Sequence, residues 1–588
     1  MPTDLRASLR LPRQAGMSRG IASFVKVFLM RQLLLPLCAL AAAGCTTMAG
    51  GSAAVETPRP LSNLPEQRIS LETMQRVTRE LSSDEFQGRA PATRGEELTV
   101  AALIREFQRA GLQPGNRGSW TQDVPLVEIT ATNSPQLRIT GGAQPLTFNY
   151  RTDLVAASYR AQPRVSFDNS EIVFVGYGIN APERGWNDYA GVDVRGKTVI
   201  ILVNDPDWQA QATQGTFNGR AMTYYGRWTY KFEEAARQGA AAALIVHDTA
   251  PASYGWMTVE NSWTGPQLYT DDGRGGADQT AANGWLTNEA ARRLLASAGQ
   301  DLDALTRRAQ QPGFRAVPLN LRASMSLENS IRRQASKNVI GILPGSVRPD
   351  EYVLYTAHWD HLGLCTETGE DRICNGAVDN ASGTAALVAL AEAHARAGPS
   401  ERSLVFLAVT AEESGLLGSA YYAANPVFPV ARTVGGLNID GLQFAGLTRD
   451  YISIGAGKSE LDQYLQRVIA PLNLSLVPEP APEAGYYYRS DHFSLAKQGV
   501  PMLYAEAGEN LVNGGPEAGA AWAREYRANR YHGINDEYDP NWNWDAALRD
   551  VQIYFQIGRG LANSRAWPNW LPGDEFRAIR DRTAAERR

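Results

Sequence analysis

The sequence predicts an α/β protein in which a mainly parallel mixed sheet, flanked by helices, carries an inserted β-rich domain. From about residue 335 onward, continuous apolar runs alternate with helical patterns, as in parallel sheets that are buried on both faces. Over about 145–330, short β-branched or aromatic runs alternate with Gly, Asn and Asp turns. The length of 588 residues also exceeds that of one ordinary domain.

The two parts of the main domain flank the insertion. Residues 67–144 open it with two helical patterns, LETMQRVTREL and GEELTVAALIREFQRAGL. Residues 331–565 contain the strand-like runs SKNVIGIL, EYVLYTA, SLVFLAV and TVGGLNI, together with the apolar helix GTAALVALAEAHARAG. The insertion, residues 145–330, has one clear helix-to-strand unit, KFEEAARQGAAAALIVHD. Residues 566–588 are expected to form a charged helix or a frayed tail in solvent.

The N-terminus is predicted to be a secretory signal rather than part of the fold. Basic residues precede an apolar stretch that is short for a membrane span, and small residues then lead to Cys45. Ala42-Ala43-Gly44-Cys45 resembles the cleavage box of bacterial lipoproteins, in which the cysteine is lipidated, although Ala42 stands where leucine is usual. We expect residues 1–45 to be a lipoprotein-type signal, or an ordinary signal peptide, followed by a flexible tether over 46–66.

Export sets the expectations for location and for the remaining cysteines. A lipidated protein would lie in the periplasm or at the outer membrane of a bacterial cell, and an unlipidated one would be secreted. In an exported protein, Cys365 and Cys374, separated by a polar loop, are expected to form a disulfide, with a metal site as the competing interpretation. A net charge of −5 without a basic patch gives no reason to expect a nucleic-acid partner.

Chemistry-bearing side chains fall where the predicted strands end. HWD closes one strand, TAEE closes a second and NID a third, while NGAVDNASG precedes the apolar helix and RYHGINDEYD follows a later helical pattern. Ligands bind at the carboxyl ends of strands in such sheets, so we expect these side chains to converge. Each of them alone could be a capping or solvated residue. The set comprises His358, Asp360, Asp379, Glu412, Glu413, Asp440 and His532.

The composition of this set indicates a divalent metal site. Imidazoles and carboxylates without a thiolate suit zinc or another borderline divalent ion. Three carboxylates and two histidines exceed the needs of one tetrahedral ion, and they suit two ions that share a bridging carboxylate. Two cations would also offset the adjacent acids Glu412 and Glu413. We expect one of these glutamates to bind metal and the other to have a different task.

In this order and spacing, HWD, GAVDNASG, AEESGLLGS, NIDG and YH…D resemble the motifs of the M28 family of zinc-dependent peptidases. The resemblance covers roughly residues 70–150 and 335–565, and it implies the zinc-exopeptidase fold. It also implies two zinc ions per subunit, with another divalent metal as the alternative. One ion would be held by His358, Asp379 and Asp440, and the second by Asp379, Glu413 and His532.

The same resemblance implies roles for neighbouring residues. Glu412 would be the general base, and Asp360 would orient His358 from behind. Tyr531 would stabilise the tetrahedral intermediate or serve only as a packing aromatic residue. YRSDHFSLAKQGVP matches a segment that lines the substrate pocket in the family, so Asp491 and His492 are interpreted as pocket wall or structural support. The insertion resembles a protease-associated (PA) domain, which could restrict access to the cleft or only stabilise the fold.

The leading expectation is an exported dizinc exopeptidase that acts on peptides, first as an aminopeptidase. A carboxypeptidase on the same scaffold would need cations for a terminal carboxylate, and Arg220, Arg227, Arg489 and Lys497 are candidates. A glutaminyl cyclase fits less well, because it uses a single metal and lacks the insertion. A non-catalytic receptor would show broken ligands, whereas all of them are present here. The sequence does not indicate an oligomeric state.

Overall fold

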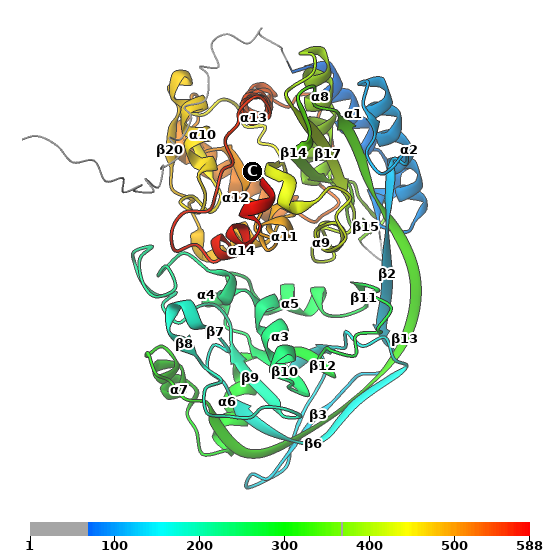
Figure 1. Ribbon diagram of the computed structural model, residues 1–588. Helices are drawn as coiled ribbons and strands as arrows, with labels where there is room; N and C mark the ends of the chain where they lie inside the picture. Colours follow the sequence, from blue (N-terminus) through cyan, green and yellow to red (C-terminus); the bar gives the residue numbers. More distant parts are fainter. Residues whose placement is uncertain (1–68, 366–368, 588) are drawn as a thin grey trace, which may run out of the picture. The chain divides into compact units, whose positions relative to one another are not determined.

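The computed structural model describes residues 69–365 and 369–587 (Figure 1). The predicted signal over 1–45, its Cys45 and the tether over 46–66 lie outside the described residues. No helix in the described part of the chain is both long and apolar enough to cross a membrane.

A mixed sheet forms the main half of the molecule, as the sequence predicted. Its four central strands, β17, β14, β18 and β21, are parallel, with antiparallel pairing on both sides. The order across the sheet is β2 (Thr121–Ala131), β13 (Val317–Leu343), β17 (Arg402–Val409), β14 (Arg348–His358), β18 (Thr433–Asn438), β21 (Met502–Ala507), β19 (Asp450–Ser453) and β20 (Ser475–Val477). The central strands are continuous apolar runs because helices cover both faces.

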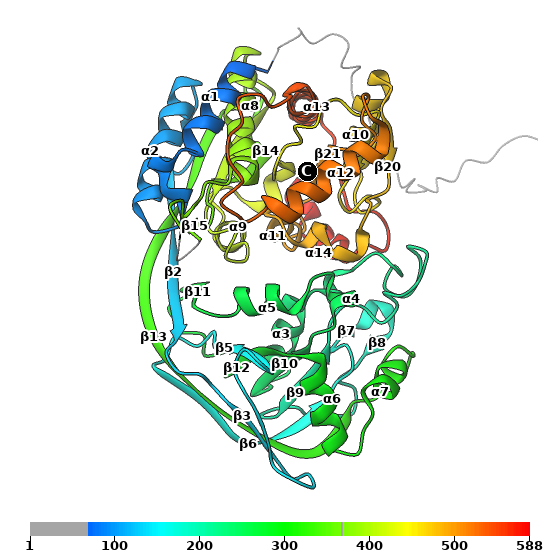
Figure 2. The ribbon, with the colours of Figure 1, turned by 180° about the vertical axis from the view of Figure 1, so that it is seen from behind.

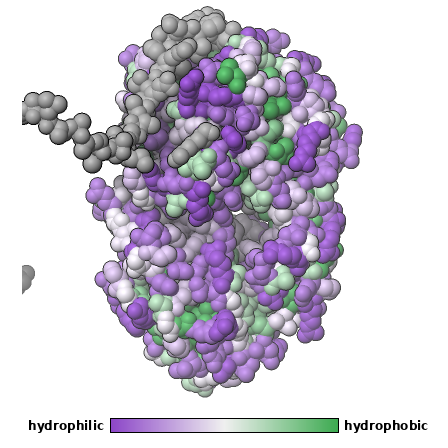
Figure 3. Space-filling model, viewed as in Figure 1, coloured by the Kyte–Doolittle hydropathy of each residue, from purple (hydrophilic) through white to green (hydrophobic). Residues whose placement is uncertain are grey.

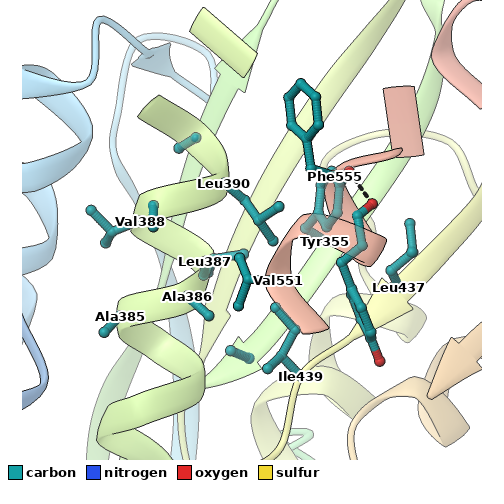
Figure 4. Packing of buried hydrophobic residues seen from close by; sticks show 14 of the residues in the cluster. Tyr355, Ala385, Ala386, Leu387, Val388, Leu390, Leu437, Ile439, Val551 and Phe555 are labelled. Atoms are coloured by element: carbon teal, nitrogen blue, oxygen red, sulfur yellow. Dashed lines mark hydrogen bonds between the residues drawn. The ribbon is translucent and has the colours of Figure 1, made fainter. Parts of the chain in front are cut away.

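Helices on one face of this sheet share its largest core, and Figures 1 and 2 both show three of them, α1, α2 and α8, grouped together. Leu387 and Leu390 of α8 lie in the packed cluster that also holds Tyr355 and Val551 (Figure 4). A smaller core on the other face includes residues of α9 and α11. The helices are α1 (Leu71–Leu81), α2 (Arg94–Arg109), α8 (Gly383–Arg396), α9 (Leu417–Ala424), α10 (Leu461–Ile469), α11 (His492–Ala496), α12 (Gly515–Asn529) and α13 (Asp545–Ala562).

The insertion, together with the residues from Leu137 that directly precede it, forms a second sheet with cores of its own. Its parallel strands β12, β10, β9 and β6 are bounded by antiparallel neighbours. The order is β5 (Leu154–Ala157), β12 (Ala282–Leu286), β10 (Ala242–Val246), β9 (Thr198–Leu202), β6 (Arg164–Phe174), β13, β3 (Leu137–Thr140) and β4 (Leu146–Phe148). The helices are α3 (Trp228–Arg237), α4 (Thr249–Ala252), α5 (Trp256–Ser262), α6 (Asn288–Ser297) and α7 (Leu302–Ala309).

Strand β13 belongs to both sheets. Residues 317–328 pair with β6, 329–339 with β2, and 339–343 with β17. Over most of its length the residues of β13 alternate between buried and exposed positions, so only its last part is a continuous apolar run. Strand β11 (Pro266–Thr270) returns from the insertion to pair with β2, and β1 (Gln113–Pro114) pairs with β13.

The C-terminal segment contains a charged helix, one of the two forms predicted for it, but its described residues pack on the main half, so the predicted position in solvent was wrong. Helix α14 (Arg577–Arg582) places Arg580 where its guanidinium donates to the carbonyl oxygens of Thr433 (2.8 Å) and Val434 (2.9 Å). Trp570 and Phe576 are also buried. The charged composition concealed these anchors, since long basic side chains can bury their stems and bind backbone carbonyls. On the face shown in Figure 3, hydrophilic side chains cover most of the surface.

Candidate metal centre

The ends of the central strands bring the predicted side chains together. His358 is the last residue of β14, Glu412 and Glu413 follow β17, and Asp440 lies two residues beyond β18. The three strands are parallel neighbours, so their carboxyl ends meet at one edge. Asp379 joins them from the segment before α8.

Two histidines face two pairs of carboxylates, and Asp379 belongs to both pairs. Nε2 of His358 lies 3.0 Å from Oδ1 of Asp440 and 3.3 Å from Oδ1 of Asp379. Nε2 of His532, in the loop after α12, lies 3.2 Å from Oδ2 of Asp379 and 3.0 Å from Oε2 of Glu413. Asp379 therefore turns one oxygen toward each histidine, the arrangement that a bridging carboxylate requires.

Burial and charge act against each other at these side chains. Burial lowers the pKa of His358, but the charges of Asp440 and Glu412 outweigh it, and the pKa is raised well above its usual value. Burial raises the pKa of Asp379, but hydrogen bonds from His358 and His532 bring it well below the usual range. The charge of His532 likewise outweighs burial and lowers the pKa of Glu413 to about 2. These carboxylates are ionised and depend on nearby positive charge.

The tautomer of His358 suits a metal ligand. Its Nδ1 donates to the backbone carbonyl of Asp360 (3.2 Å), which can only accept. Nε2, which faces the carboxylates, is therefore the nitrogen that would lose its proton and give its lone pair to a cation. The Asp360 carboxylate lies farther from the ring, with Oδ1 3.9 Å from Nδ1. Its oxygens accept instead from the amides of Glu412 (3.1 Å) and Glu413 (3.4 Å). Asp360 thus orients His358 through its backbone carbonyl, and it fixes the backbone of Glu412 and Glu413 through its carboxylate.

The two adjacent glutamates diverge because the chain turns sharply before them. Ala411 has φ 51°, in the left-handed region that residues other than glycine seldom adopt. Glu413 then points into the Asp379–His532 pair, whereas Glu412 lies beside His358 without a hydrogen bond to a histidine within the described residues. Burial raises the pKa of Glu412 well above its usual value, and the charges of Asp440 and Glu413 add to this. Glu412 is therefore the acid of the cluster that remains available for proton transfer.

His361 is a member of the site that the sequence interpretation missed. Its Nδ1 lies 2.6 Å from Oε1 of Glu413, the oxygen that does not face His532. Asp379, Glu413 and His361 also group closely enough to hold a metal ion. The sequence does show a second histidine directly after HWD. The direction of the His361 side chain, however, depends on the course of a loop, which the strand pattern does not predict.

Two further residues position the loops of the site. Arg89, fully buried, donates to the carbonyl oxygens of Trp359 (2.9 Å), Asn375 (2.6 Å) and Gly376 (2.9 Å). Its position follows a helix and carries no motif, so nothing in the sequence distinguished it.

Asp536 accepts from the backbone amides of Val378 and Asp379, each at 3.0 Å. Burial raises the pKa of Asp536 to about 6. These hydrogen bonds fix the backbone of the segment that presents Asp379. Asp536 belongs to the same YH…D motif as His532, which was predicted to bind the metal.

The remaining predicted residues lie around the cluster. Tyr531 is 49% exposed and its ring stacks on His532, with 3.8 Å between centroids. Asp491 is buried, and burial raises the pKa of its carboxyl group to about 7, although the charge of His358 lowers it. His492 is fully buried, with its ring 4.6 Å from that of Tyr487, so it has no surface to offer a substrate. Of the two meanings considered for His492, structural support is the one that fits.

Cys365 and Cys374 form a disulfide, with Cα atoms 5.7 Å apart. Cys365 directly follows β15 (Gly363–Leu364), and Cys374 is the last residue of β16 (Ile373–Cys374), with which β15 pairs. The bridge therefore closes the connection between these two strands, which lie between His361 and Asp379 in the chain.

The donor set fits divalent metal ions. His358, Asp379 and Asp440 offer ligand atoms that all lie within 4.8 Å of one another, and so do His361, Asp379 and Glu413. Imidazole nitrogen and carboxylate oxygen are ligands that zinc and similar ions accept. Cations here would also compensate buried carboxylates that otherwise repel one another.

Comparisons with known proteins find aminopeptidases that are similar to part of this chain. Aminopeptidase NAALADL1 of Mus musculus is 32% identical over 146 residues, which are 23% of this chain and 18% of that protein. Aminopeptidase YwaD of Bacillus subtilis (strain 168) is 37% identical over 90 residues, 15% of this chain and 18% of YwaD. These matches span about a fifth of the curated relatives' length.

Among solved structures, an aminopeptidase from Aneurinibacillus sp. strain AM-1 aligns with a TM-score of 0.46 and 20% identity, covering 84% of this chain and 93% of that one. The sequence model of peptidase family M28 matches residues 338–556, the segment that contains the histidines and acids of the cluster. This segment of the chain is therefore similar to peptidase family M28.

Proposed function

We propose that the protein is an exported metallo-exopeptidase that holds two zinc ions and releases N-terminal residues from peptides. The observation that carries the proposal is the pair of histidine–carboxylate groups that share Asp379, next to the available acid Glu412. The named relatives support zinc and the amino end, because NAALADL1 and YwaD are called aminopeptidases and a matching Bacillus subtilis structure is titled a zinc aminopeptidase.

Each residue has a task in this proposal. His358, Asp379 and Asp440 would hold one ion, and Asp379, Glu413 and His532 the other. The ions would polarise the peptide carbonyl and lower the pKa of water toward about 7. Glu412 would take a proton from the attacking water and return it to the leaving amine. Tyr531, held against His532, would donate its hydroxyl to the developing oxyanion.

The test is hydrolysis of a peptide panel by the zinc-loaded full-length protein, with free and with acetylated N-termini, reading which residue is released. Release of the first residue only when the amine is free is the expected result. Release from the carboxyl end, regardless of acetylation, would instead establish the carboxypeptidase alternative, in line with a match to a glutamate carboxypeptidase 2 homolog of Caenorhabditis elegans.

The matched variants are Glu412→Gln and Glu97→Gln. Glu412→Gln keeps the size of the side chain but removes the base, so kcat should fall by about 10²–10⁴ while the zinc content per chain stays the same. Glu97, 68% exposed on α2, should tolerate the same exchange without a change in kcat. Full activity of Glu412→Gln would disprove the general-base role.

The location belongs to the same proposal. Cys45 would be lipidated after cleavage of the signal, which would hold the enzyme at a bacterial membrane facing the periplasm or the exterior. Mass spectrometry of the mature N-terminus would show a diacylglyceryl cysteine at Cys45 or, against the proposal, an unmodified residue.

A further inference from the structure

A small cavity at the end of strand β21 borders the metal centre. Its wall includes Asp440, Tyr504 and Glu506, together with Asp550 of helix α13. The enclosed space is about 10 Å³, which is room for one water molecule, and an ammonium group has a similar size. Asp440 also faces Nε2 of His358 at 3.0 Å, so it belongs both to the metal centre and to the wall of this cavity.

The register of the sheet places Glu506 beside Asp440. Strands β18 and β21 are parallel neighbours, and Asn438, the last residue of β18, pairs with Tyr504. Two residues further along each segment, Asp440 and Glu506 therefore lie at the same level, on backbones that are about 4.8 Å apart where the strands pair. The hydroxyl of Tyr504 donates to the backbone carbonyl of Asp440 (3.0 Å), which ties the two segments together.

The carboxyl group of Glu506 has no partner in the described part of the chain, where it makes neither a hydrogen bond nor an ion pair. Burial, followed by the charges of Asp550 and Glu479, raises the pKa of Glu506 to about 8, while the charge of Arg527 acts in the opposite direction. A cation placed next to this carboxyl group would favour its ionised form.

Asp550 adds an oxygen that is also unused. The residue is 3% exposed, and its Oδ2 accepts from the backbone amide of Ala507 (3.0 Å). Its Oδ1 is buried and accepts no hydrogen bond from any described residue. Nε of Arg549 lies 3.8 Å from this oxygen, beyond hydrogen-bond distance, and the other two nitrogens of Arg549 donate to Thr448 (2.8 Å each). A buried carboxyl oxygen without a donor is costly, so this wall favours a ligand that donates.

The charges on the wall decide what kind of ligand fits. Asp440, Glu506 and Asp550 are acidic, the other residues of the wall are uncharged, and no basic side chain among the described residues lines the cavity. An anion would be repelled, and an apolar group would leave the carboxyl oxygens unsatisfied. An ammonium group offers three donors and a positive charge in a volume that fits the space.

We propose that Glu506 and Asp550 form a subsite that binds the side-chain ammonium group of a peptide's first residue. Because Asp440 lies both at the metal centre and on the cavity wall, a first residue held at the metal ions has its side chain next to this space. Lysine carries its compact charge on a flexible four-carbon stem, whereas the guanidinium of arginine is larger and planar. The inference rests on the proposed aminopeptidase function and specifies its substrate class as peptides with an N-terminal lysine.

Lysine and norleucine provide the matched pair of first residues, because norleucine has the same unbranched carbon chain without the ammonium group. For the full-length zinc-loaded protein, kcat/KM should favour Lys-Ala-Ala over norleucine-Ala-Ala by about 10- to 100-fold, as expected for charge-assisted hydrogen bonds. Glu506→Gln removes the charge and keeps the size of the side chain, so this ratio should fall below about 3. Equal cleavage of the two peptides by wild type would overturn the subsite.

A reversal of charge tests the sign of the interaction. Glu506→Lys should favour Glu-Ala-Ala over Gln-Ala-Ala, an order that wild type should not show. Glu517→Gln is the matched control, because Glu517 is exposed on α12 and should leave the preference for lysine unchanged. If Glu506→Gln does not fold, Asp550→Asn tests the same space from α13 and should also lower the ratio. An unchanged preference for lysine in Glu506→Gln and in Asp550→Asn would overturn the subsite.

Binding separates this inference from the proposed function. Reduced-amide analogues of the lysine and norleucine peptides cannot be hydrolysed, and calorimetry can measure their Kd. Tighter binding of the lysine analogue to wild type, lost in Glu506→Gln, would support the subsite even if no peptide were cleaved. Peptide cleavage with equal binding of both analogues would support the peptidase and overturn the subsite. An equal loss of binding for both analogues in Glu506→Gln would assign Glu506 to another part of the substrate and would overturn it as well.

Discussion

The two oxygens of Glu413 are held by different histidines. Nδ1 of His361 lies 2.6 Å from Oε1, and Nε2 of His532 lies 3.0 Å from Oε2. Glu413 is ionised, so its oxygens can only accept, and Nδ1 of His361 must carry the proton. One oxygen is thereby fixed in a hydrogen bond, and the other remains for a cation. Contacts of this kind orient a metal ligand without touching the metal.

Replacing His361 should therefore weaken metal binding. His361→Ala removes the donor to Glu413, and zinc affinity should fall by about 10- to 100-fold. His361→Asn places an amide N–H near the position of Nδ1 and should recover part of the loss. Competition with a chromogenic chelator measures the affinity. His394→Gln is the control, because this histidine is buried against Tyr355, away from the cluster. Unchanged zinc affinity in His361→Ala would refute the orienting role.

At the residue scale, the sequence was most informative where a motif coincided with a strand end. His358, Glu413 and Asp440 could be placed because apolar runs stop beside them. Arg89 and His361 could not, since their positions depend on loops that carry no periodic pattern. Asp360 could be predicted to support His358, but its contact with the Glu412 amide could not, because that contact depends on the turn at Ala411.

At the scale of elements, the strands and helices with continuous apolar character were predictable. Helix α8 is buried along nearly its whole length, and β17 along all of it. Strand β13 was predicted only from residue 336, because its earlier part is polar on one side and pairs with different strands along its length. Helix α14 was misjudged because its burial depends on a single arginine and two aromatic anchors.

Helix α13 approaches strand β14 so closely that only glycine fits at the contact. A methyl group at Gly558 would overlap the Tyr355 hydroxyl, which also bonds to His394 (2.8 Å) and to the carbonyl of Tyr554 (3.1 Å). Gly558→Ala should lower the free energy of unfolding by about 1–3 kcal/mol, even though alanine favours helix by about 1 kcal/mol. Urea denaturation measures the change.

A second substitution distinguishes the overlap from other effects. Tyr355→Phe removes the hydroxyl, so Gly558→Ala should cost less in that background than in wild type. Gln556→Ala lies on a half-exposed position of the same helix and should change stability by less than about 0.5 kcal/mol. Equal costs of Gly558→Ala with and without the Tyr355 hydroxyl would contradict the role given to the hydroxyl and would assign the overlap to the ring carbon Cζ, which phenylalanine retains.

At the scale of the whole molecule, buried acids link stability to pH. The chain carries a net charge of −5, and several of its carboxyl groups lie in the interior, some far from the metal centre. Asp188 in the insertion is 1% exposed and accepts from Trp186 Nε1 (2.8 Å) and from the amide of Ile179 (3.0 Å). Burial outweighs these contacts and raises the pKa of Asp188 to about 7. The insertion should therefore be less stable in neutral than in acidic solution.

The sign follows from the two pKa values. Below about pH 4, Asp188 is protonated in both the folded and the unfolded chain. Between about pH 4 and pH 7 only the unfolded chain ionises, so the free energy of unfolding falls by about 1.4 kcal/mol per pH unit. Above about pH 7 both states are ionised and the loss levels off. Asp188→Asn cannot ionise, so the stability of wild type relative to this variant should fall by about 2–3 kcal/mol between pH 5 and pH 8.

Urea unfolding followed by tryptophan fluorescence at pH 5, 6, 7 and 8 measures this difference. Asp193→Asn is the control: Asp193 is exposed, and Arg195 holds the pKa of its carboxyl well below the usual value. Asp193 is then ionised in both states throughout this range, so its substitution should shift all four curves equally. Parallel shifts for Asp188→Asn as well would show that the Asp188 carboxyl is ionised in the folded insertion, with Lys231 neutralising it, and that other groups set the pH dependence.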